Sequence, residues 1–211
     1  DFVVPATATN CTVTNTRKTT TLQLTKVWSG TSSATDSATI GVTTGGLNNT
    51  TSFTTVGGIA ADSGTAVTVA VGNTITFPAE TGTNIGNYNT VLSCLADSGA
   101  TANTLSGTDG QVSNTLVIDA GDSGKAIVCT YTNTRKTATL TLRKTWAASS
   151  IAGNTTTVTS TGFTNNASSG LSTATAIGNT TTGSVVTVYA GESGTITEAF
   201  TVGSASNYNA V

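Results

Sequence analysis

Two lysines stand at positions where the strand pattern of the sequence predicts a buried side chain. In two similar segments, two leucines, a lysine and a tryptophan alternate onto one face: Leu22, Leu24, Lys26 and Trp28, and then Leu140, Leu142, Lys144 and Trp146. Burial disfavours an ammonium ion, so an inward lysine loses its proton or finds a partner. The neutral amine is a nucleophile. Alternatively, Lys26 lies near the end of its strand and its ammonium reaches water or a carboxylate.

The sequence also supplies an electrophile for such an amine. One face of a later segment carries Ile127, Cys129, Tyr131 and Asn133, so the carboxamide of Asn133 points inward as well. The amine of Lys26 can attack the carboxamide carbon if a nearby carboxyl, kept protonated by burial, transfers protons. Ammonia then leaves, and an isopeptide bond joins the two side chains. The tryptophans, the leucines and Tyr131 on these faces are expected to form the core.

These segments belong to an internal repeat. Residues Cys11–Trp28 return as Cys129–Trp146 with thirteen of eighteen positions identical, and "NYNTV" from Asn87 returns as "NYNAV" from Asn207. A period of about 118 residues is too long for a solenoid and fits an array of whole domains. We therefore divide the chain into closing strands of a preceding or neighbouring unit (1–18), a complete unit (19–136) and a unit that lacks its final strands (137–211).

The pattern predicts an all-β fold of tandem β-sandwich domains, Ig-like or prealbumin-like. Threonine and valine favour strands, and acid-Ser-Gly triplets mark the turns between them. The predicted strands are Thr19–Trp28, Ser37–Val42, Thr65–Val71, Asn73–Phe77, Tyr88–Leu95, Val112–Asp119 and Lys125–Asn133. About seven short strands in one unit is typical of a sandwich. The last strand of one unit runs into the first strand of the next, so no flexible linker is expected.

The composition excludes several classes of function. Only 9% of residues are charged and the net charge is −2, which argues against binding to nucleic acid or to an anionic membrane. No apolar run is long enough to span a bilayer. The chain has no histidine, no convergent acids and no phosphate-binding loop, so we expect neither an enzyme, nor a cofactor, nor a metal site.

The segments "LTLRKTW", "GTITEAF", "NYN" and "CTYTNTRK" together resemble the prealbumin-like (transthyretin-like) domains of the SpaA/CnaB type. Such domains occur in Gram-positive pilins and in large repetitive surface proteins of other bacteria. The resemblance implies an isopeptide between a lysine on the first strand and an asparagine on the last. Those positions are Lys26 and Asn133 here, while Lys144 begins the next set and Asn15 ends the previous one.

The family also places a glutamate on a middle strand. In the second unit Glu198 is in phase with Ile196, as the resemblance implies. In the first unit Phe77 stands at that place, and Glu80 follows Pro78 out of phase unless Pro78 marks a bulge. Without that bulge, the first unit lacks the acid that the cross-linking reaction needs.

Three cysteines complete the set of reactive residues. The composition resembles that of bacterial surface proteins, which favours disulfides over thiols. Cys94 and Cys129 both fall on strands of the complete unit, and a bond between them would stabilise the unit by about 4 kcal/mol in the chain-entropy model. Buried free thiols are the alternative. Cys11 is the equivalent of Cys129 and has no partner of its own in this chain, which makes it a candidate for an interdomain or intersubunit disulfide.

These features favour a structural function, as a repeat unit of an extracellular bacterial fibre, stalk or large adhesin. Its partners would be adjacent repeats or identical subunits. One alternative is a pilin-like subunit that polymerises head to tail, with the N-terminal segment of one copy completing the last unit of another. A second alternative is an adhesive module that binds glycan or protein through its loops, although those loops have almost no aromatic residues.

Overall fold

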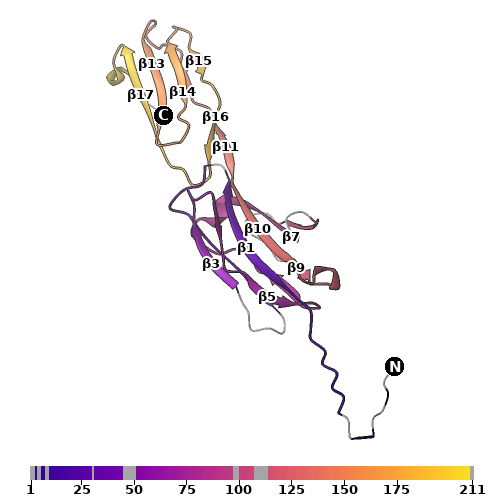
Figure 1. The fold of residues 1–211 in the computed structure, drawn as a ribbon. Helices are drawn as coiled ribbons and strands as arrows, with labels where there is room; N and C mark the ends of the chain where they lie inside the picture. The colour runs from indigo at the N-terminus through magenta and orange to yellow at the C-terminus, as the bar shows by residue number, and fades with distance from the viewer. Residues whose placement is uncertain are drawn as a thin grey trace.

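The structure is a computed structural model that describes residues 3, 6–7, 10–29, 31–44, 51–96, 100–106 and 114–209. Among these residues it contains no α-helix, and the regular structure consists of strands with three 3-10 turns, Ile85–Asn87 (η1), Ala120–Asp122 (η2) and Ala205–Asn207 (η3). No helix in the described part of the chain could cross a membrane. Figure 1 shows two bodies of strands, with the N-terminal segment extending away from the first body. We call residues 19–136 the first unit and residues 137–209 the second unit.

Two sheets form the first unit. The larger has the order β4-β1-β10-β7-β8, with β5 also paired to β1, and the smaller has the order β3-β2-β6-β9. The strands of the larger sheet are β1 (Thr19–Ser29), β4 (Ala61–Ser63), β5 (Val67–Ala70), β7 (Tyr88–Ala96), β8 (Ala100–Ser106) and β10 (Ala126–Arg135). Those of the smaller sheet are β2 (Ser37–Thr44), β3 (Thr51–Val56), β6 (Thr74–Phe77) and β9 (Asn114–Val117). The predicted strand Val112–Asp119 begins outside the described residues.

The first and last strands of the unit lie side by side. β1 pairs with β10 in parallel from Thr21 to Ser29, so that Trp28 lies opposite Asn133. The alternation along β1 puts Leu22, Leu24, Lys26 and Trp28 on the buried face. The core between the sheets contains the leucines of β1 together with Ile75, Phe77 and Tyr131. Every second side chain along β1 is therefore buried, as the alternation in the sequence predicted, and one of these buried side chains is a lysine.

Three strands of the first unit, β3, β4 and β8, are not among those predicted from the sequence. Their sequences are TSFTTV, ADS and ATANTLS, which lack a regular alternation of apolar and polar residues. β3, β4 and β8 are sheet edges, and β3 and β8 are threonine-rich. Threonine fits a pleated surface without contributing to a core, so periodicity alone gives no signal there.

The second unit repeats part of this arrangement with shorter pairings. β11 pairs with β16, β12 with β15, and β13 lies between β14 and β17. The bounds are β11 (Thr137–Leu140), β12 (Arg143–Trp146), β13 (Thr155–Thr161), β14 (Ser168–Thr173), β15 (Asn179–Thr182), β16 (Val186–Tyr189) and β17 (Thr195–Val202). β11 and β12 together correspond to β1, but they are interrupted because the described chain provides no parallel strand like β10 beside them.

This interruption changes the burial of the leucines in the second unit. Leu142 is buried and Trp146 is 2% exposed, whereas Leu140 is only half-buried. Leu140 is therefore less buried than its counterpart Leu22, and its place in the core stays a prediction. The reason is that alternation fixes the face of a strand, while full burial also needs a second layer that covers the face.

Candidate functional site

Four polar side chains meet inside the core of the first unit. Lys26, Glu80, Thr90 and Asn133 are each at most 5% exposed. The Lys26 Nζ lies 2.6 Å from the Glu80 Oε1. The Thr90 Oγ1 lies 2.8 Å from the Glu80 Oε2 and 2.7 Å from the Asn133 Oδ1. A continuous chain of polar contacts thus connects the lysine amine with the carboxamide of asparagine. We call these four residues the buried quartet.

Three strands and one bulge position the quartet. Lys26 lies on β1, Thr90 on β7 and Asn133 on β10, all with inward phase. Glu80 follows β6, and the pairing of this segment with β2 shifts by one residue between Thr76 and Thr81. The extra residue lies in the stretch that contains Pro78, as expected for a bulge. The bulge turns the Glu80 side chain into the core.

The sequence left open whether a bulge brings Glu80 to the inward face. The bulge is present, so the first unit has a glutamate in contact with Lys26. The spacing of residues in the repeat indicates that Glu80 is this acid, although the alternation along the strand does not. Glu80 follows Trp28 by the same number of residues as Glu198 follows Trp146. In the second unit Glu198 lies opposite Val158 on β13, the equivalent of the β2 segment beside Glu80. Spacing from the repeated motif thus identifies the glutamate better than local alternation does.

Burial controls the electrostatics of the quartet. Desolvation lowers the pKa of Lys26 to about 8, although the charge and the hydrogen bond of Glu80 act in the opposite direction. The Nζ also lies 4.9 Å from the centre of the Trp28 ring. A neutral amine is therefore far more accessible here than for a lysine in water. A buried ion pair stabilises a fold little more than apolar residues of the same volume would. The presence of these polar residues in the core is therefore not explained by stability alone.

The hydroxyl of Thr90 lies between the carboxyl of Glu80 and the carboxamide of Asn133. A threonine hydroxyl donates one hydrogen, yet Thr90 lies within hydrogen-bond distance of two oxygens. The hydroxyl therefore donates to one of these oxygens at a time, and when it donates to the Asn133 Oδ1 it polarises that carbonyl. This is the carbonyl whose carbon the amine of Lys26 would attack.

Sequence reasoning missed Thr90, although its phase indicated it. Tyr88, Thr90, Leu92 and Cys94 alternate onto the buried face of β7, so Thr90 is a polar residue at an inward position, as are Lys26 and Asn133. The Asn133 Nδ2 makes no hydrogen bond among the described residues, so the amide nitrogen is not held by a partner. This nitrogen is the leaving group of the predicted reaction.

The predicted disulfide is present in the structure. Cys94 and Cys129 are bonded to each other, and they lie directly opposite on the neighbouring strands β7 and β10. The bond closes a loop with a sequence separation of 35 residues. Cys11 is free and exposed, and Asn15 is also exposed. The predicted roles of Cys11 and Asn15 in other units therefore stay predictions.

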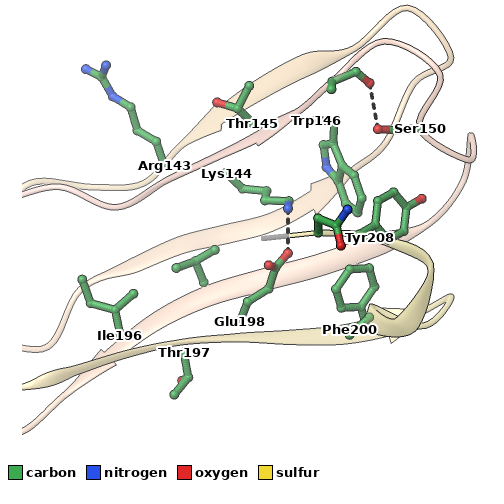
Figure 2. A pocket seen from close by; sticks show the side chains of 14 residues that line it. Arg143, Lys144, Thr145, Trp146, Ser150, Ile196, Thr197, Glu198, Phe200 and Tyr208 are labelled. Carbon is green, nitrogen blue, oxygen red and sulfur yellow. Dashed lines mark hydrogen bonds and ion pairs between the residues drawn. The ribbon is translucent and has the colours of Figure 1, made fainter. Parts of the chain in front are cut away.

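A second lysine–glutamate pair lies in the second unit. The Lys144 Nζ and the Glu198 Oε1 are 2.7 Å apart, with side-chain exposures of 16% and 25%. Figure 2 shows this pair in a pocket beside Trp146, Phe200 and Tyr208. The pocket has a volume of about 630 Å³. In the first unit the equivalent pair, Lys26 and Glu80, is buried, and β10 pairs with β1 beside Lys26.

Comparisons with known proteins agree with this architecture. Residues 19–135 match the SpaA family described as a prealbumin-like fold domain, and this match covers more than half of the chain. No curated protein and no solved structure matches the chain. On the strength of the family match, which contains the buried quartet and the disulfide, this chain belongs to the SpaA family of prealbumin-like fold domains.

Proposed function

We propose that this chain is a structural module of an extracellular bacterial fibre or surface protein, and that an amide bond between Lys26 and Asn133 stiffens its first unit. The observation that carries this proposal is the buried quartet, in which the amine, the carboxyl and the carboxamide are connected by contacts of 2.6–2.8 Å. The family match supports the fibre, because SpaA-type domains are generally modules of pilins and other surface proteins.

The reaction needs no external reagent. The neutral amine of Lys26 attacks the carboxamide carbon of Asn133 while Glu80, acting through Thr90, stabilises the charge that develops on the carbonyl oxygen. The Glu80 carboxyl gives its proton through Thr90 to the carbonyl oxygen, and the resulting carboxylate accepts a proton from the attacking nitrogen. Glu80 then delivers that proton to the departing amide nitrogen, while the oxygen returns its proton through Thr90 and the carbonyl re-forms. The C–N bond to Nδ2 breaks, the C–N bond to the Lys26 Nζ remains, and one ammonia molecule leaves.

The position of this bond suits a load-bearing role. The chain enters the unit at Thr19 and leaves it at Arg135, so tension pulls β1 and β10 in opposite directions along their shared pairing. A bond between Lys26 and Asn133 transmits this tension without loading residues 27–132. The disulfide between Cys94 and Cys129 fixes β10 to β7 in the same sheet.

Intact mass spectrometry of the denatured monomer tests the proposal. We expect the mass of the chain to fall short of the sequence mass by one ammonia, in addition to the two hydrogens that the disulfide removes. The variants Lys26→Ala and Asn133→Ala should restore the ammonia. Lys144→Ala is the matched control, because Lys144 also contacts a glutamate and a tryptophan yet lies in the open pocket, so this variant should keep the deficit. A wild-type monomer without the deficit would contradict the proposal.

A second candidate function is polymerisation by strand addition, in which residues 11–18 of one copy pair with the second unit of another copy. The amide bond would then form between Asn15 of one chain and Lys144 of the other. The open pocket at Lys144 and Glu198 favours it, because residues 11–18 closely match residues 129–136, whose strand β10 fills the equivalent space in the first unit. Denaturing gels then show covalent oligomers that disappear in Asn15→Ala. Monomers alone, at high protein concentration, would exclude this candidate.

A further inference from the structure

The joint between the two units is a set of hydrogen bonds centred on two residues. β10 ends at Arg135 and β11 begins at Thr137, so Lys136 alone separates the strands. The guanidinium of Arg135 donates through Nη1 to the carbonyl of Thr31 in the first unit, at 3.0 Å, and through Nε to the carbonyl of Ala190 in the second, at 2.9 Å. One side chain thus holds both units.

Lys136 connects the same two surfaces. Its backbone N–H donates to the carbonyl of Asn87 at 2.9 Å, and its ammonium donates to the carbonyl of Gly86 at 2.9 Å. Its own carbonyl accepts from the N–H of Ala190 at 2.9 Å. The units also touch directly, because a Cβ on Gly191 (φ +81°) would lie 2.4 Å from the Asn87 Nδ2. Figure 1 shows β11 beginning where β10 ends.

The same contacts occur at the other end of the first unit, where residues Arg17 and Lys18 enter it. The Nε of Arg17 donates to the carbonyl of Val71 at 2.8 Å, and the N–H of Val71 donates to the carbonyl of Lys18 at 2.9 Å. Val71 is the equivalent of Ala190, and the glycine that follows it, Gly72, also has a positive φ of +85°. Arg17 and Lys18 therefore contact the turn at Val71 as Arg135 and Lys136 contact the turn at Ala190. Among the described residues, no preceding unit lies on the other side of Arg17 and Lys18.

The opposite half of the joint is also repeated, at the far end of the second unit. In the first unit the carbonyls of Gly86 and Asn87 belong to η1, which is anchored by the next residue. The Tyr88 hydroxyl donates to the Asp36 Oδ2 at 2.6 Å and accepts from the N–H of Ser33 at 3.1 Å. These contacts tie η1 to the loop that carries Thr31.

Tyr208 makes the equivalent anchor beside η3. Its hydroxyl accepts from the N–H of Ile151 at 3.1 Å and from the Asn154 Nδ2 at 2.8 Å. Ile151 and Asn154 are the equivalents of Ser33 and Asp36 in the repeat. Ser206 and Asn207 in η3 are the equivalents of Gly86 and Asn87 in η1.

We propose that each Arg–Lys pair is a rigid joint that docks one prealbumin-like unit on the next in a single orientation. Arg17, Lys18 and the turn Val71–Gly72 form the docking surface for a preceding unit of the same kind. That unit supplies carbonyls equivalent to those of Thr31, Gly86 and Asn87. This inference goes beyond the cross-link, since it holds whether or not the amide between Lys26 and Asn133 forms.

A repeated joint has a consequence for the assembled chain. Each unit has a turn like Val71–Gly72 at one end and carbonyls like those of Thr31, Gly86 and Asn87 at the other. The two contacting surfaces are therefore different, and such heterologous contacts build an open array instead of a closed dimer. The same contacts at each joint impose the same rotation and translation per unit. The array is therefore a regular rod rather than a string of independently moving domains.

Distances between spin labels in the two units test the joint in the existing chain. Labels are attached through Val117→Cys on β9 and Leu171→Cys on β14, which are 58% and 63% exposed, in a Cys11→Ser background. We expect one narrow distance distribution for this chain and loss of the narrow peak when Arg135→Ala and Lys136→Ala are combined. Arg143→Ala, an exposed arginine on β12, is the control and should leave the peak unchanged. A broad distribution before these changes, or a narrow one after them, would overturn the proposal.

An extended chain tests the docking surface at Arg17. Residues 19–128 are placed directly before residues 11–211, which adds one whole unit and keeps the repeat in register. Labels at Val117 of the added unit and of the original unit should give a narrow distribution, and Arg17→Ala with Lys18→Ala should abolish the narrow peak. A broad distribution in the unmodified extended chain would show that this surface does not dock a preceding unit.

Discussion

At the scale of single residues, the quartet is a buried arrangement in which one hydroxyl connects a carboxyl that contacts an amine with a carboxamide. Lys26 is fully buried, and desolvation lowers its pKa to about 8. The Thr90 hydroxyl lies within hydrogen-bond distance of both the Glu80 Oε2 and the Asn133 Oδ1. These facts make Thr90 a positioning residue between acid and carbonyl, and they give two predictions about the rate of cross-linking.

The first prediction concerns the hydroxyl of Thr90. Thr90→Val keeps the shape of the side chain but removes the hydrogen bond to the Asn133 carbonyl, so we expect cross-linking to slow by about a hundredfold to a thousandfold, the range for losing a stabilising donor. The rate is measured by mass spectrometry after refolding from denaturant. Thr90→Ser keeps the hydroxyl and should retain most of the rate. Equal rates for the valine and serine variants would contradict the assigned role.

The second prediction concerns pH. The proposed reactive form is a neutral Lys26 amine with a protonated Glu80 carboxyl. It contains the same number of protons as the ion pair of the two residues, so a change in pH does not convert one form into the other. The fraction of the reactive form is therefore constant over the pH range in which the pair keeps this number of protons. Above the Lys26 pKa of about 8 the pair loses one proton and the acid is no longer available. The cross-linking rate should therefore be flat on the acid side of pH 8 and fall above it. A rate that rises through pH 8 would show that only the neutral amine is needed.

At the scale of elements, the sheet order brings the reactive residues together. β10 lies between β1 and β7, so Asn133 and Cys129 each find a partner on a neighbouring strand, and the one-residue bulge after β6 adds Glu80. Alternation predicted the inward phase of Lys26 and Asn133 correctly. It did not place Glu80, because a bulge changes phase without a regular sequence signature.

The element-scale prediction concerns the disulfide between β7 and β10. Replacing Cys94 and Cys129 together by alanine removes the closure of a loop with a separation of 35 residues. In an Asn133→Ala background, where the amide cannot form, the loss should be about 4 kcal/mol in the free energy of unfolding. Urea titration followed by tryptophan fluorescence measures it. Cys11→Ser in the same background should leave the midpoint unchanged, because Cys11 is exposed and free.

At the scale of the whole molecule, the proposed amide and the proposed Arg–Lys joint lie on the same path of tension, whereas the disulfide between Cys94 and Cys129 lies in the part of the unit that the amide would bypass. Tension that enters the first unit at Thr19 passes through β1 and β10 and reaches the second unit through Arg135. The proposed amide protects the interior of the unit, and the joint keeps successive units aligned. A fibre built this way would resist both extension and bending.

The molecular-scale prediction is mechanical. Under tension applied through the ends of the chain, the first unit of the cross-linked protein should give no extension from residues 27–132. Lys26→Ala should let this unit unfold, with the residues between Cys94 and Cys129 released only after reduction. Optical tweezers measure both steps as gains in contour length. A full-length gain from the cross-linked protein would show that the amide does not carry the load.

The sequence by itself determined the class of fold, the repeat and the inward phase of the reactive lysine, asparagine and cysteines, because these follow from a local period of two residues. The tertiary structure decided which strands are neighbours, how the bulge turns Glu80 inward, that Thr90 connects acid and carbonyl, and that Arg135 joins two units. These features depend on pairing and register between segments far apart in the chain. Alternation within one strand carries no information about the strand that will lie beside it.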